Sequence, residues 1–331
     1  MTVTVMTRNV YLGADINRPV RAAHGLSGPE ALAAIRRAND EVRAIVDRTD
    51  FGVRSRLLAT EIAATRPDLV GLQELALWRE GPLEPTAIGV PNASEVAYDF
   101  LGMLLHELEG QDLHYDVVQV QEESDVEGPA TGRDVRLTLR DVILVHAGPG
   151  VAARERGSGQ YQARLNVDLA GASFGYLRGF AWADVEAGGN RFRFVTTHLE
   201  SESPEVAQAQ AVELLTGPAA ATAEPVVIVG DLNADADPPD PAYAVLTGAG
   251  FADTWRAEAG PGFTFGLSET VDDEEPSFDR RIDYVLARGL SPEQLEQSQG
   301  QLTGDQLTDR DPTTGLWPSD HAGLVVRLAV G

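Results

Sequence analysis

The sequence contains no cysteine, no lysine and no long run of apolar residues. Without cysteine there are no disulfide bonds and no thiolate metal ligands, so composition leaves the redox compartment open. A membrane-spanning helix needs roughly 20 consecutive apolar residues, and no stretch approaches that length. The chain runs from Met1 straight into a predicted strand, with no targeting signal. We therefore expect a soluble monomer, either cytoplasmic or secreted after a signal peptide is removed.

Positive charge is also scarce. All 26 basic residues are arginine, against 51 acidic residues, so the formal net charge is −25. Such a surface repels polyanions at long range and attracts divalent cations. A phosphate-bearing substrate would therefore have to be held by a local arginine cluster or by a metal ion. A salt-rich habitat and a GC-rich genome would explain this composition equally well.

Hydrophobic residues make up 43% of the 331 residues, which is enough for a large core. Apolar periodicity and turn residues place the predicted elements along the chain. Strands are predicted over residues 2–10, 69–74, 114–120, 135–145, 161–169, 176–185, 192–198, 226–229, 281–286 and 324–328. Helices are predicted over about 30–46, 55–65, 95–109, a segment after Pro204, and 241–246. The acidic, glycine-bearing segment 122–133 is expected to be a mobile loop. Strand-rich halves with helices between them indicate two packed sheets covered by helices.

The predicted strand over 226–229 leads directly into Gly230-Asp231-Leu232-Asn233. Side chains two residues apart in a strand share a face, so Asp231 and Asn233 point the same way. Burying a carboxylate and an amide beside an apolar strand costs free energy unless a function needs them there. Because Gly-Asp turns also end many strands, a structural and a catalytic interpretation are equally open for this pair.

Other predicted strands also end in, or contain, a polar residue among apolar neighbours. These residues are Asn9, Glu74, His198, Asp283, Asp320 and His321. Each alone has an ordinary structural explanation, such as a solvated strand end, a turn or a buried ion pair. The set is more informative than its members, because strand ends of a layered sheet converge on one edge and can share a cleft.

The chain resembles the endonuclease/exonuclease/phosphatase superfamily over residues 5–328. That group includes pancreatic-type DNases, abasic-site endonucleases, bacterial sphingomyelinases and inositol-polyphosphate 5-phosphatases. The resemblance rests on the ordered motifs Asn9, Leu-Gln-Glu74, Thr-Thr-His198-Leu, Gly-Asp231-Leu-Asn233, Arg-Ile-Asp283-Tyr and Ser-Asp320-His321. It implies an α/β fold, a four-layer α/β/β/α sandwich with two packed, mostly antiparallel sheets.

The resemblance also implies hydrolysis of phosphoester bonds with a divalent metal, usually Mg²⁺, with Mn²⁺ or Ca²⁺ as alternatives. Glu74 would be the principal metal ligand, with Asp320 and Asn9 close by. Carboxylates and water are the ligands that Mg²⁺ prefers. Asp231 would accept a proton from the attacking water, and Asn233 would position that water or the phosphate.

Two histidines complete the implied chemistry. His198 and His321 would flank the phosphoryl group and stabilise charge on its oxygens, and the choice of general acid stays open. Each imidazole needs a partner that fixes its tautomer. The resemblance implies Asp283 as the partner of His321, and Asp141 as the partner of His198. Arg178 matches a substrate-phosphate arginine, with a surface strand arginine as the alternative.

The chain differs from the DNase-type members at two positions. Those enzymes carry an arginine and a tyrosine where this chain has Ala76 and Leu139. Both residues contact DNA in that subgroup, so this chain lacks the contacts for groove binding in the pancreatic-DNase manner. We predict one domain over residues 1–331, with a helical insertion at about 17–49 next to the site and a polar excursion at about 290–318.

The leading hypothesis is a metal-dependent phosphodiesterase or nuclease that acts on DNA or RNA. A lipid or inositol phosphate hydrolase is the alternative. It would favour an exposed apolar rim, for which Trp78, Phe263, Phe265 and Trp317 are candidates. A non-catalytic binding module is disfavoured, because a degenerate member would be expected to lose the metal glutamate or a histidine, and none is missing. The sequence does not choose among phosphodiester substrates, or between monoesterase and diesterase action.

Overall fold

The computed structural model describes residues 1–331 except 87–89, 149, 170–171 and 257–258. Two sheets pack face to face, and helices cover the outer face of each. In each sheet one pair of neighbouring strands is parallel, β1 with β2 and β11 with β12, and the other pairs are antiparallel. The predicted mixture of mostly antiparallel sheets is therefore confirmed.

The larger sheet has eight strands. Seven follow the order β15 (Gln299–Thr303), β16 (Gly323–Ala329), β1 (Thr2–Asn9), β2 (Leu69–Gln73), β6 (Arg133–His146), β3 (Leu77–Pro82) and β4 (Glu95–Asp99). The eighth, β5 (Tyr115–Pro129), pairs with β6 and forms a long hairpin with it. The N-terminal strand thus lies in the interior of the sheet.

The smaller sheet has six strands in the order β13 (Ala252–Asp253), β14 (Asp283–Arg288), β12 (Val226–Asp231), β11 (Asn190–His198), β10 (Gly179–Ala187) and β7 (Val151–Gln160). A separate pair is formed by β8 (Asn166–Leu169) and β9 (Ala172–Gly175). The strand that carries the Gly-Asp-Leu-Asn motif, β12, therefore lies near the middle of its sheet.

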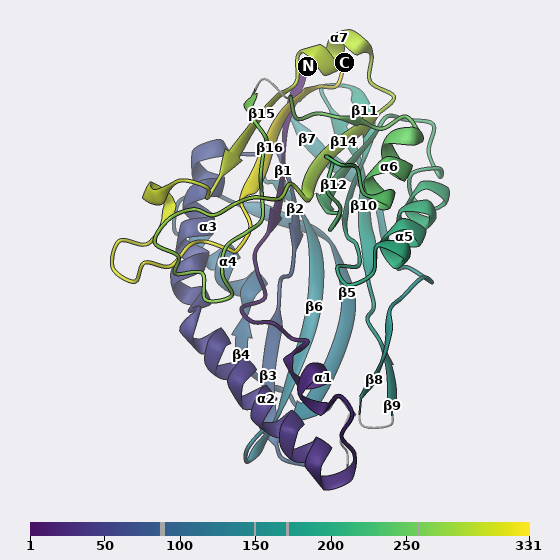
Figure 1. The fold of residues 1–331 in the computed structure, drawn as a ribbon. Coiled ribbons are helices and arrows are strands. Elements are labelled where there is room, and N and C mark those ends of the chain that lie inside the picture. The colour runs from purple at the N-terminus through teal and green to yellow at the C-terminus, as the bar shows by residue number, and fades with distance from the viewer. Residues whose placement is uncertain (87–89, 149, 170–171, 257–258) are drawn as a thin grey trace.

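Helices form the two outer layers. They are α1 (Arg18–Ala23), α2 (Gly28–Arg48), α3 (Phe51–Thr65), α4 (Phe100–Glu109), α5 (Pro204–Thr216) and α6 (Pro241–Gly248). A further helix, α7 (Pro292–Glu296), lies at the end of the sandwich near the two termini. Figure 1 shows α3 and α4 on the side of the eight-stranded sheet, and α5 and α6 on the side of the six-stranded sheet. The predicted four-layer α/β/β/α sandwich is confirmed. Within the described residues, no helix combines the length and apolar character needed to cross a membrane.

The apolar runs of the sequence fill both faces of the central strands. In β12, Val227 and Val229 pack between the two sheets, whereas Val226 and Ile228 pack against α5 and α6. Successive strand side chains point to opposite faces, so a strand buried on both faces is a continuous apolar run. The same alternation in β6 divides its residues between the inter-sheet core and the core under α3 and α4.

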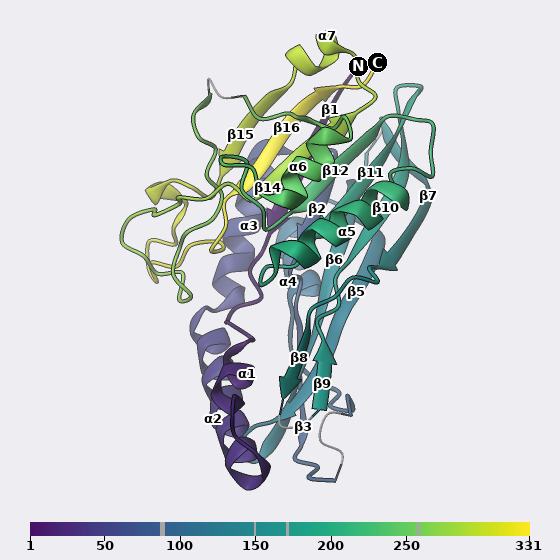
Figure 2. The same cartoon turned by 45° about the vertical axis from the view of Figure 1, so that its right-hand side comes forward.

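The β5–β6 hairpin corrects the expectation of a mobile loop over 122–133. Both strands extend through this segment, and ion pairs such as Asp125–Arg136 at 2.5 Å connect them. An acidic composition therefore does not require a loop when the neighbouring strand supplies arginines. Figures 1 and 2 show the far end of the hairpin close to α1 and α2. Those two helices occupy the segment predicted as an insertion, and its status as an insertion stays a prediction.

Other elements also differ from the sequence predictions. The predicted helix over 95–109 begins only at Phe100, because residues 95–99 form β4. The strands β3 and β7 were not predicted, and only the end of the predicted strand over 161–169 is a strand, β8. β7 is an edge strand rich in arginine, glutamate and glycine, so it shows no apolar alternation. The polar excursion at about 290–318 contains α7 and β15.

Candidate active site

Three neighbouring strands of the six-stranded sheet carry a polar residue at the same edge, where β11 and β12 end and β14 begins. The register pairs His198 of β11 with Asp231 of β12, and Asp231 with Asp283 of β14. His321 joins this row because its Nδ1 lies 2.8 Å from Asp283 Oδ2. Four residues far apart in the sequence therefore meet at one end of this sheet.

The eight-stranded sheet brings its own strand ends to the same place. In the parallel pair β1–β2, Asn9 lies beside Gln73, and Glu74 follows directly. Glu74 has a φ of 62°, which turns the chain sharply at the strand end. The Leu12 amide donates to Glu74 Oε2 at 2.8 Å. Asn9 Nδ2 donates to Asp231 Oδ2 at 3.1 Å, a hydrogen bond that links the two sheets.

A cleft of about 340 Å³ opens at this end of the sandwich. Seven of the ten predicted site residues line it: Glu74, Arg178, His198, Asp231, Asn233, Asp320 and His321. The other three, Asn9, Asp141 and Asp283, lie behind it and are at most 1% exposed. The structure thus brings the predicted residues together, while their chemical roles stay predictions.

Asp231 is the most closely surrounded carboxylate of the site. Its Oδ1 accepts a hydrogen bond from the Asn233 amide at 2.9 Å. Its Oδ2 lies 3.5 Å from His198 Nε2 and 3.7 Å from His321 Nε2. Burial and the negative charge of Asp283 raise the pKa of Asp231 to about 7. A carboxyl group with a pKa near neutrality can both accept and release a proton under ordinary conditions.

His321 is positively charged at neutral pH. Burial lowers its pKa, but the negative charges of Asp283, Asp320 and Asp231 outweigh burial and raise the pKa to about 10. The hydrogen bond to Asp283 engages Nδ1, so Nε2–H is the donor that faces the cleft. The ring of Phe265 packs against the imidazole with a centroid distance of 4.9 Å.

His198 is held by an arginine instead of the predicted carboxylate. Arg178 Nη1 lies 2.9 Å from His198 Nδ1, and because a guanidinium only donates, the ring proton is assigned to Nε2. Burial and the positive charge of Arg178 lower the pKa of His198 well below its usual value, so the ring is neutral. The expected hydrogen bond from His198 to Asp141 is not formed, since neither Asp141 oxygen has a hydrogen-bond partner. Arg178 itself is largely buried, with a side-chain exposure of 13%, so the alternative of a surface arginine is wrong.

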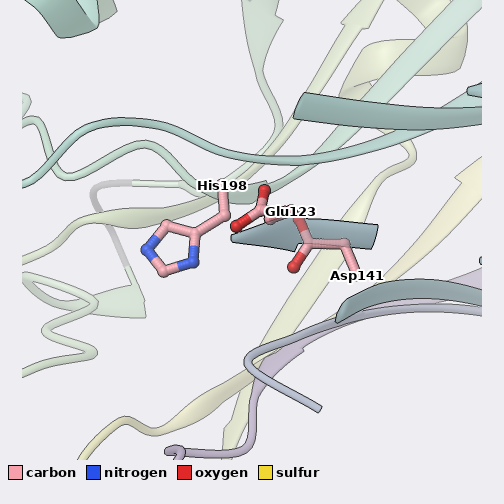
Figure 3. A group of neighbouring side chains, drawn as sticks. All are labelled: Glu123, Asp141 and His198. Atoms are coloured by element: carbon pink, nitrogen blue, oxygen red, sulfur yellow. The ribbon is translucent and has the colours of Figure 1, made fainter. Parts of the chain in front are cut away.

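Glu123 is a site residue that the sequence analysis missed. Its Oε2 lies 3.3 Å from Arg178 Nη1, and its Oε1 accepts from the Gly179 amide at 3.1 Å. Figure 3 shows the Glu123 carboxylate between the His198 ring and Asp141. Burial raises the pKa of Glu123 to about 7. No sequence signal pointed to this residue, because it lies in the segment that resembles a loop.

Glu200 is a second acid that the sequence analysis missed. It lines the cleft at only 3% exposure, and its Oε1 accepts from the amides of Ser201 and Glu202 at 3.0 Å. Its Oε2 has no hydrogen-bond partner. Glu200 follows His198 by two residues, so the alternation of strand side chains was a usable signal for placing both on one face.

Two groups of three potential metal ligands occur among the described residues. They are Glu123, Asp141 and His198, and Asp231, Asp283 and His321. Each group already contains a positive charge: Arg178 lies against the first, and His321 itself carries the charge of the second. A further cation at either group would meet this positive charge.

Glu74 and Asp320 offer a better position for a metal ion. Burial and the negative charge of Glu74 raise the pKa of Asp320 to about 6, although His321 acts in the opposite direction. A divalent cation between two such carboxylates would relieve their repulsion, and one or two carboxylates are what Mg²⁺ ordinarily uses. The Asn9 amide is engaged at both ends, by the Tyr11 amide at 2.9 Å and by Asp231, so it orients Asp231. The chemistry of Glu74 and Asp320 thus fits a divalent cation such as Mg²⁺, which these two carboxylates would hold.

Comparison with known proteins agrees with this geometry. A sequence model of the endonuclease/exonuclease/phosphatase family matches residues 46–321. The chain belongs to this family. Its members are phosphoester hydrolases that generally depend on a divalent metal. The match begins near the end of α2, so α1 and most of α2 lie outside it. A comparison with curated proteins found no match.

Solved structures of the family share the fold. A family protein from Bacteroides thetaiotaomicron has a TM-score of 0.57 at 16% identity, covering 99% of this chain and 97% of that one. Truncated TDP2 from Caenorhabditis elegans has a TM-score of 0.52 at 17% identity, with coverages of 99% and 97%. A mannosyl-6-phosphatase from Bacteroides thetaiotaomicron has a TM-score of 0.56 at 16% identity, with coverages of 99% and 99%. Identities this low establish the fold and do not identify the substrate.

The four aromatic residues suggested for an apolar rim do not form one. Trp78 and Trp317 are 3% and 0% exposed, and each donates its indole N–H to a backbone carbonyl oxygen. Phe265 packs against His321 inside the cleft. Phe263 is 38% exposed but does not line the cleft. Aromatic residues in this chain mostly serve the core.

Proposed function

We propose that this chain hydrolyses phosphodiester bonds with the help of a divalent metal ion, Mg²⁺ in the first instance and Mn²⁺ or Ca²⁺ as substitutes. The observation that carries the proposal is the environment of Asp231. This carboxyl group, with a pKa near 7, lies between a neutral His198 and a protonated His321. It faces a cleft that also carries the carboxylates of Glu74 and Asp320.

Asp231 acts as the general base in this proposal. Its Oδ1 is fixed by the Asn233 amide, so Oδ2 is the oxygen that takes a proton from the attacking water. The Asn233 side chain donates from Nδ2 to the Leu199 carbonyl oxygen at 2.9 Å, which directs its own oxygen to the water. A base whose pKa lies close to the working pH is the most effective kind.

The two histidines act on the phosphoryl group in different ways. His321 carries a proton and a positive charge, so it stabilises negative charge and can protonate the leaving oxygen. Neutral His198 donates only its Nε2–H, which Arg178 fixes by holding Nδ1. Such oriented donors act mainly on charge that develops in the transition state. We therefore assign the general acid to His321 and a hydrogen-bonding role to His198.

The metal ion, when bound, would supply Lewis-acid stabilisation of the phosphoryl oxygens. Glu74 and Asp320 would hold it. The surrounding chain orients these carboxylates: the Leu12 amide donates to Glu74, and the Ser319 hydroxyl lies 3.3 Å from Asp320 Oδ1. Ligands fixed in this way lose little freedom when an ion binds.

Nucleic acid is the first substrate candidate from the sequence. Arg178 is the only arginine that lines the cleft within the described part of the chain, and it already contacts Glu123 and His198. The net charge of −25 opposes a polyanion. DNA or RNA would therefore be held by few phosphate contacts, and its hydrolysis would fall on a shallow slope as salt rises. A smaller phosphodiester with an apolar group is the second candidate, because an apolar chamber lined by residues such as Trp78 and Val126 lies beside the cleft.

The test is a hydrolysis panel of plasmid DNA, RNA, sphingomyelin, inositol phosphates and a nitrophenyl diester. Each substrate is measured with Mg²⁺ and with excess EDTA. Glu74→Gln should abolish most of the activity while the circular dichroism spectrum and Tm stay near wild type. Glu109→Gln, at the exposed end of α4, is the matched control and should change neither. Undiminished turnover in excess EDTA would overturn the metal-dependent mechanism.

A further inference from the structure

A partly open apolar chamber lies beside the catalytic cleft. Its volume is about 140 Å³ and its lining is mostly aliphatic. Helices α1 and α2 contribute one wall, and β3 with the β5–β6 hairpin contributes another. The side chains that form it include Val20, Val42, Trp78, Val126, Val135 and Leu137. None of the residues assigned above to metal binding or proton transfer, all of which the structure describes, lines this chamber.

The chamber and the cleft are neighbours that share part of their walls. Ile16 and Tyr176 line both of them. On β6, Leu139 lines the cleft and Leu137 lines the chamber, and strand residues two apart share a face at a spacing of about 7 Å. Val126 of β5 pairs with Leu137 in the register and lines the same chamber. One face of the β5–β6 hairpin therefore lines both the cleft and the apolar chamber.

The chamber wall is also tied to the proposed metal site. Trp78 Nε1 donates to the Leu12 carbonyl oxygen at 3.0 Å, and the Leu12 amide donates to Glu74 Oε2. Two polar side chains of the lining already make hydrogen bonds to the backbone: Asn39 Nδ2 donates to a carbonyl oxygen, and Glu127 Oε2 accepts from two amides. An occupant of the chamber would therefore meet mostly apolar surface, and Leu12 would link the Trp78 side of its wall to the proposed metal ligand Glu74.

We infer that this chamber holds an apolar ester group of the substrate, of the bulk of one aromatic ring or a short branched alkyl chain, while its phosphate lies in the cleft. This inference rests on the proposed function. An aliphatic cavity of about 150 Å³ in another protein binds benzene, so a chamber of this size fits such a group. Among the residues that the structure describes, the lining contains no arginine, lysine or histidine, which favours an uncharged occupant.

The test compares two phosphonates, which the enzyme cannot hydrolyse. Binding of each to the full chain is measured by calorimetry in Mg²⁺. Methylphosphonate supplies only the anionic head, whereas benzylphosphonate adds one ring. We expect benzylphosphonate to bind on the order of 10- to 100-fold more tightly, the range for burying one apolar group. Thymidine 5′-phosphate, whose base is polar, should gain no such factor over methylphosphonate.

A pair of matched variants locates the effect. Val126→Phe puts a ring into the mouth of the chamber, and because Val126 is 42% exposed, the core need not open. This variant should lose the preference for benzylphosphonate while binding methylphosphonate like wild type. Val117→Phe makes the same exchange on the same strand, at a valine that is 39% exposed and outside the chamber, and it should keep the preference. If Val126→Phe does not fold, Val20→Phe fills the chamber from α1.

Three results would overturn the inference. Equal affinities of the wild type for the two phosphonates would do so, as would a preference for benzylphosphonate that survives in the chamber variant that folds, Val126→Phe or Val20→Phe. A larger gain for thymidine 5′-phosphate would assign the chamber to a nucleotide base instead. Binding of benzene alone, followed by ligand-observed NMR, separates the two proposals. If benzene binds but neither phosphonate binds in Mg²⁺, the proposed phosphoester site is wrong and the chamber has no substrate role. If both phosphonates bind with equal affinity and benzene does not bind, the inference about the chamber is wrong and the proposed phosphoester site stands.

Discussion

Gly230 offers a test of how closely the strands that carry the site must approach. It precedes Asp231 on β12 and lies opposite Thr197 of β11, with a φ of 149°. A Cβ atom at this position would lie 1.9 Å from the Thr197 carbonyl oxygen, whereas ordinary contacts begin at 3.4 Å. In Gly230→Ala the two strands would therefore have to separate by about 1.5 Å.

The expected cost of this separation has two parts. Overpacking of a dense interior costs about 1–3 kcal/mol. Weakening one or two ladder hydrogen bonds adds about 1 kcal/mol each. We therefore expect the free energy of unfolding to fall by about 2–5 kcal/mol. His198 and Asp231 follow directly on these strands, and because a misplacement of about 1 Å can cost roughly 100-fold in rate, kcat should fall by about that factor.

Urea denaturation followed by circular dichroism measures the first effect, and steady-state hydrolysis with Mg²⁺ measures the second. Gly248→Ala, at the end of α6, is the control, because an added Cβ there meets no atom within 4 Å. It should leave kcat unchanged and stabilise the protein by up to about 1 kcal/mol. If Gly230→Ala unfolds at the wild-type urea concentration and retains wild-type kcat, the close strand contact is not what requires glycine here.

Three further outcomes are expected. Asp231→Asn should lower kcat by about two or more orders of magnitude at saturating substrate, and a variant that keeps more than about a tenth of wild-type kcat would show that another group is the base. The double variant Asp283→Ala/His321→Ala should have a kcat little lower than that of His321→Ala alone, because Asp283 acts through the imidazole of His321. Additive losses in kcat would contradict this role of Asp283. Glu123→Gln should gain stability relative to wild type between about pH 5 and 8. The reason is that the pKa of Glu123 rises from 4.5 in the unfolded chain to about 7 in the folded protein, so the folded wild type is stabilised when this carboxyl group is neutral. That stabilisation is fully present below pH 4.5 and is lost as the pH rises through about 7, whereas the glutamine variant does not titrate. Urea unfolding curves at about pH 5 and about pH 8 measure the free energy of unfolding of both proteins. If the difference in this free energy between Glu123→Gln and wild type is the same at the two pH values, the pKa of Glu123 is not raised by folding.

The site was predictable from the sequence because its residues interrupt apolar strands. Asp231 ends a strand whose preceding residues are buried on both faces. A carboxylate at this position does not contribute to apolar packing, so its presence indicates a function. The register explains the convergence, since His198, Asp231 and Asp283 occupy paired positions on three neighbouring strands. The four-layer fold followed from the family resemblance and the same apolar runs.

The parts that were not predicted depend on contacts between distant strands. The buried carboxylate of Glu123 is held by Arg178 and by the Gly179 amide of β10. Neither contact can be predicted from the residues next to Glu123 in the sequence. The partner of His198 Nδ1 was assigned to Asp141, yet Arg178 lies closer to that nitrogen. Spacing along the chain cannot decide which of two neighbouring polar groups faces a ring nitrogen. The burial of Trp78 was missed because its partner is a backbone carbonyl group.

The position of β1 has a consequence for how the protein folds. β1 lies between β2 and β16, and Thr2 pairs with Ala329 across almost the entire chain. Contacts of such large sequence separation form late, because the entropy of closing the loop opposes them until other structure exists. Asn9 ends β1, and His321 comes just before β16, so both reach their places only when these strands pair. During synthesis on the ribosome, the cleft would be completed among the last events. The recovery of turnover in a refolding experiment should therefore follow the closure of the eight-stranded sheet and not the earlier formation of helices.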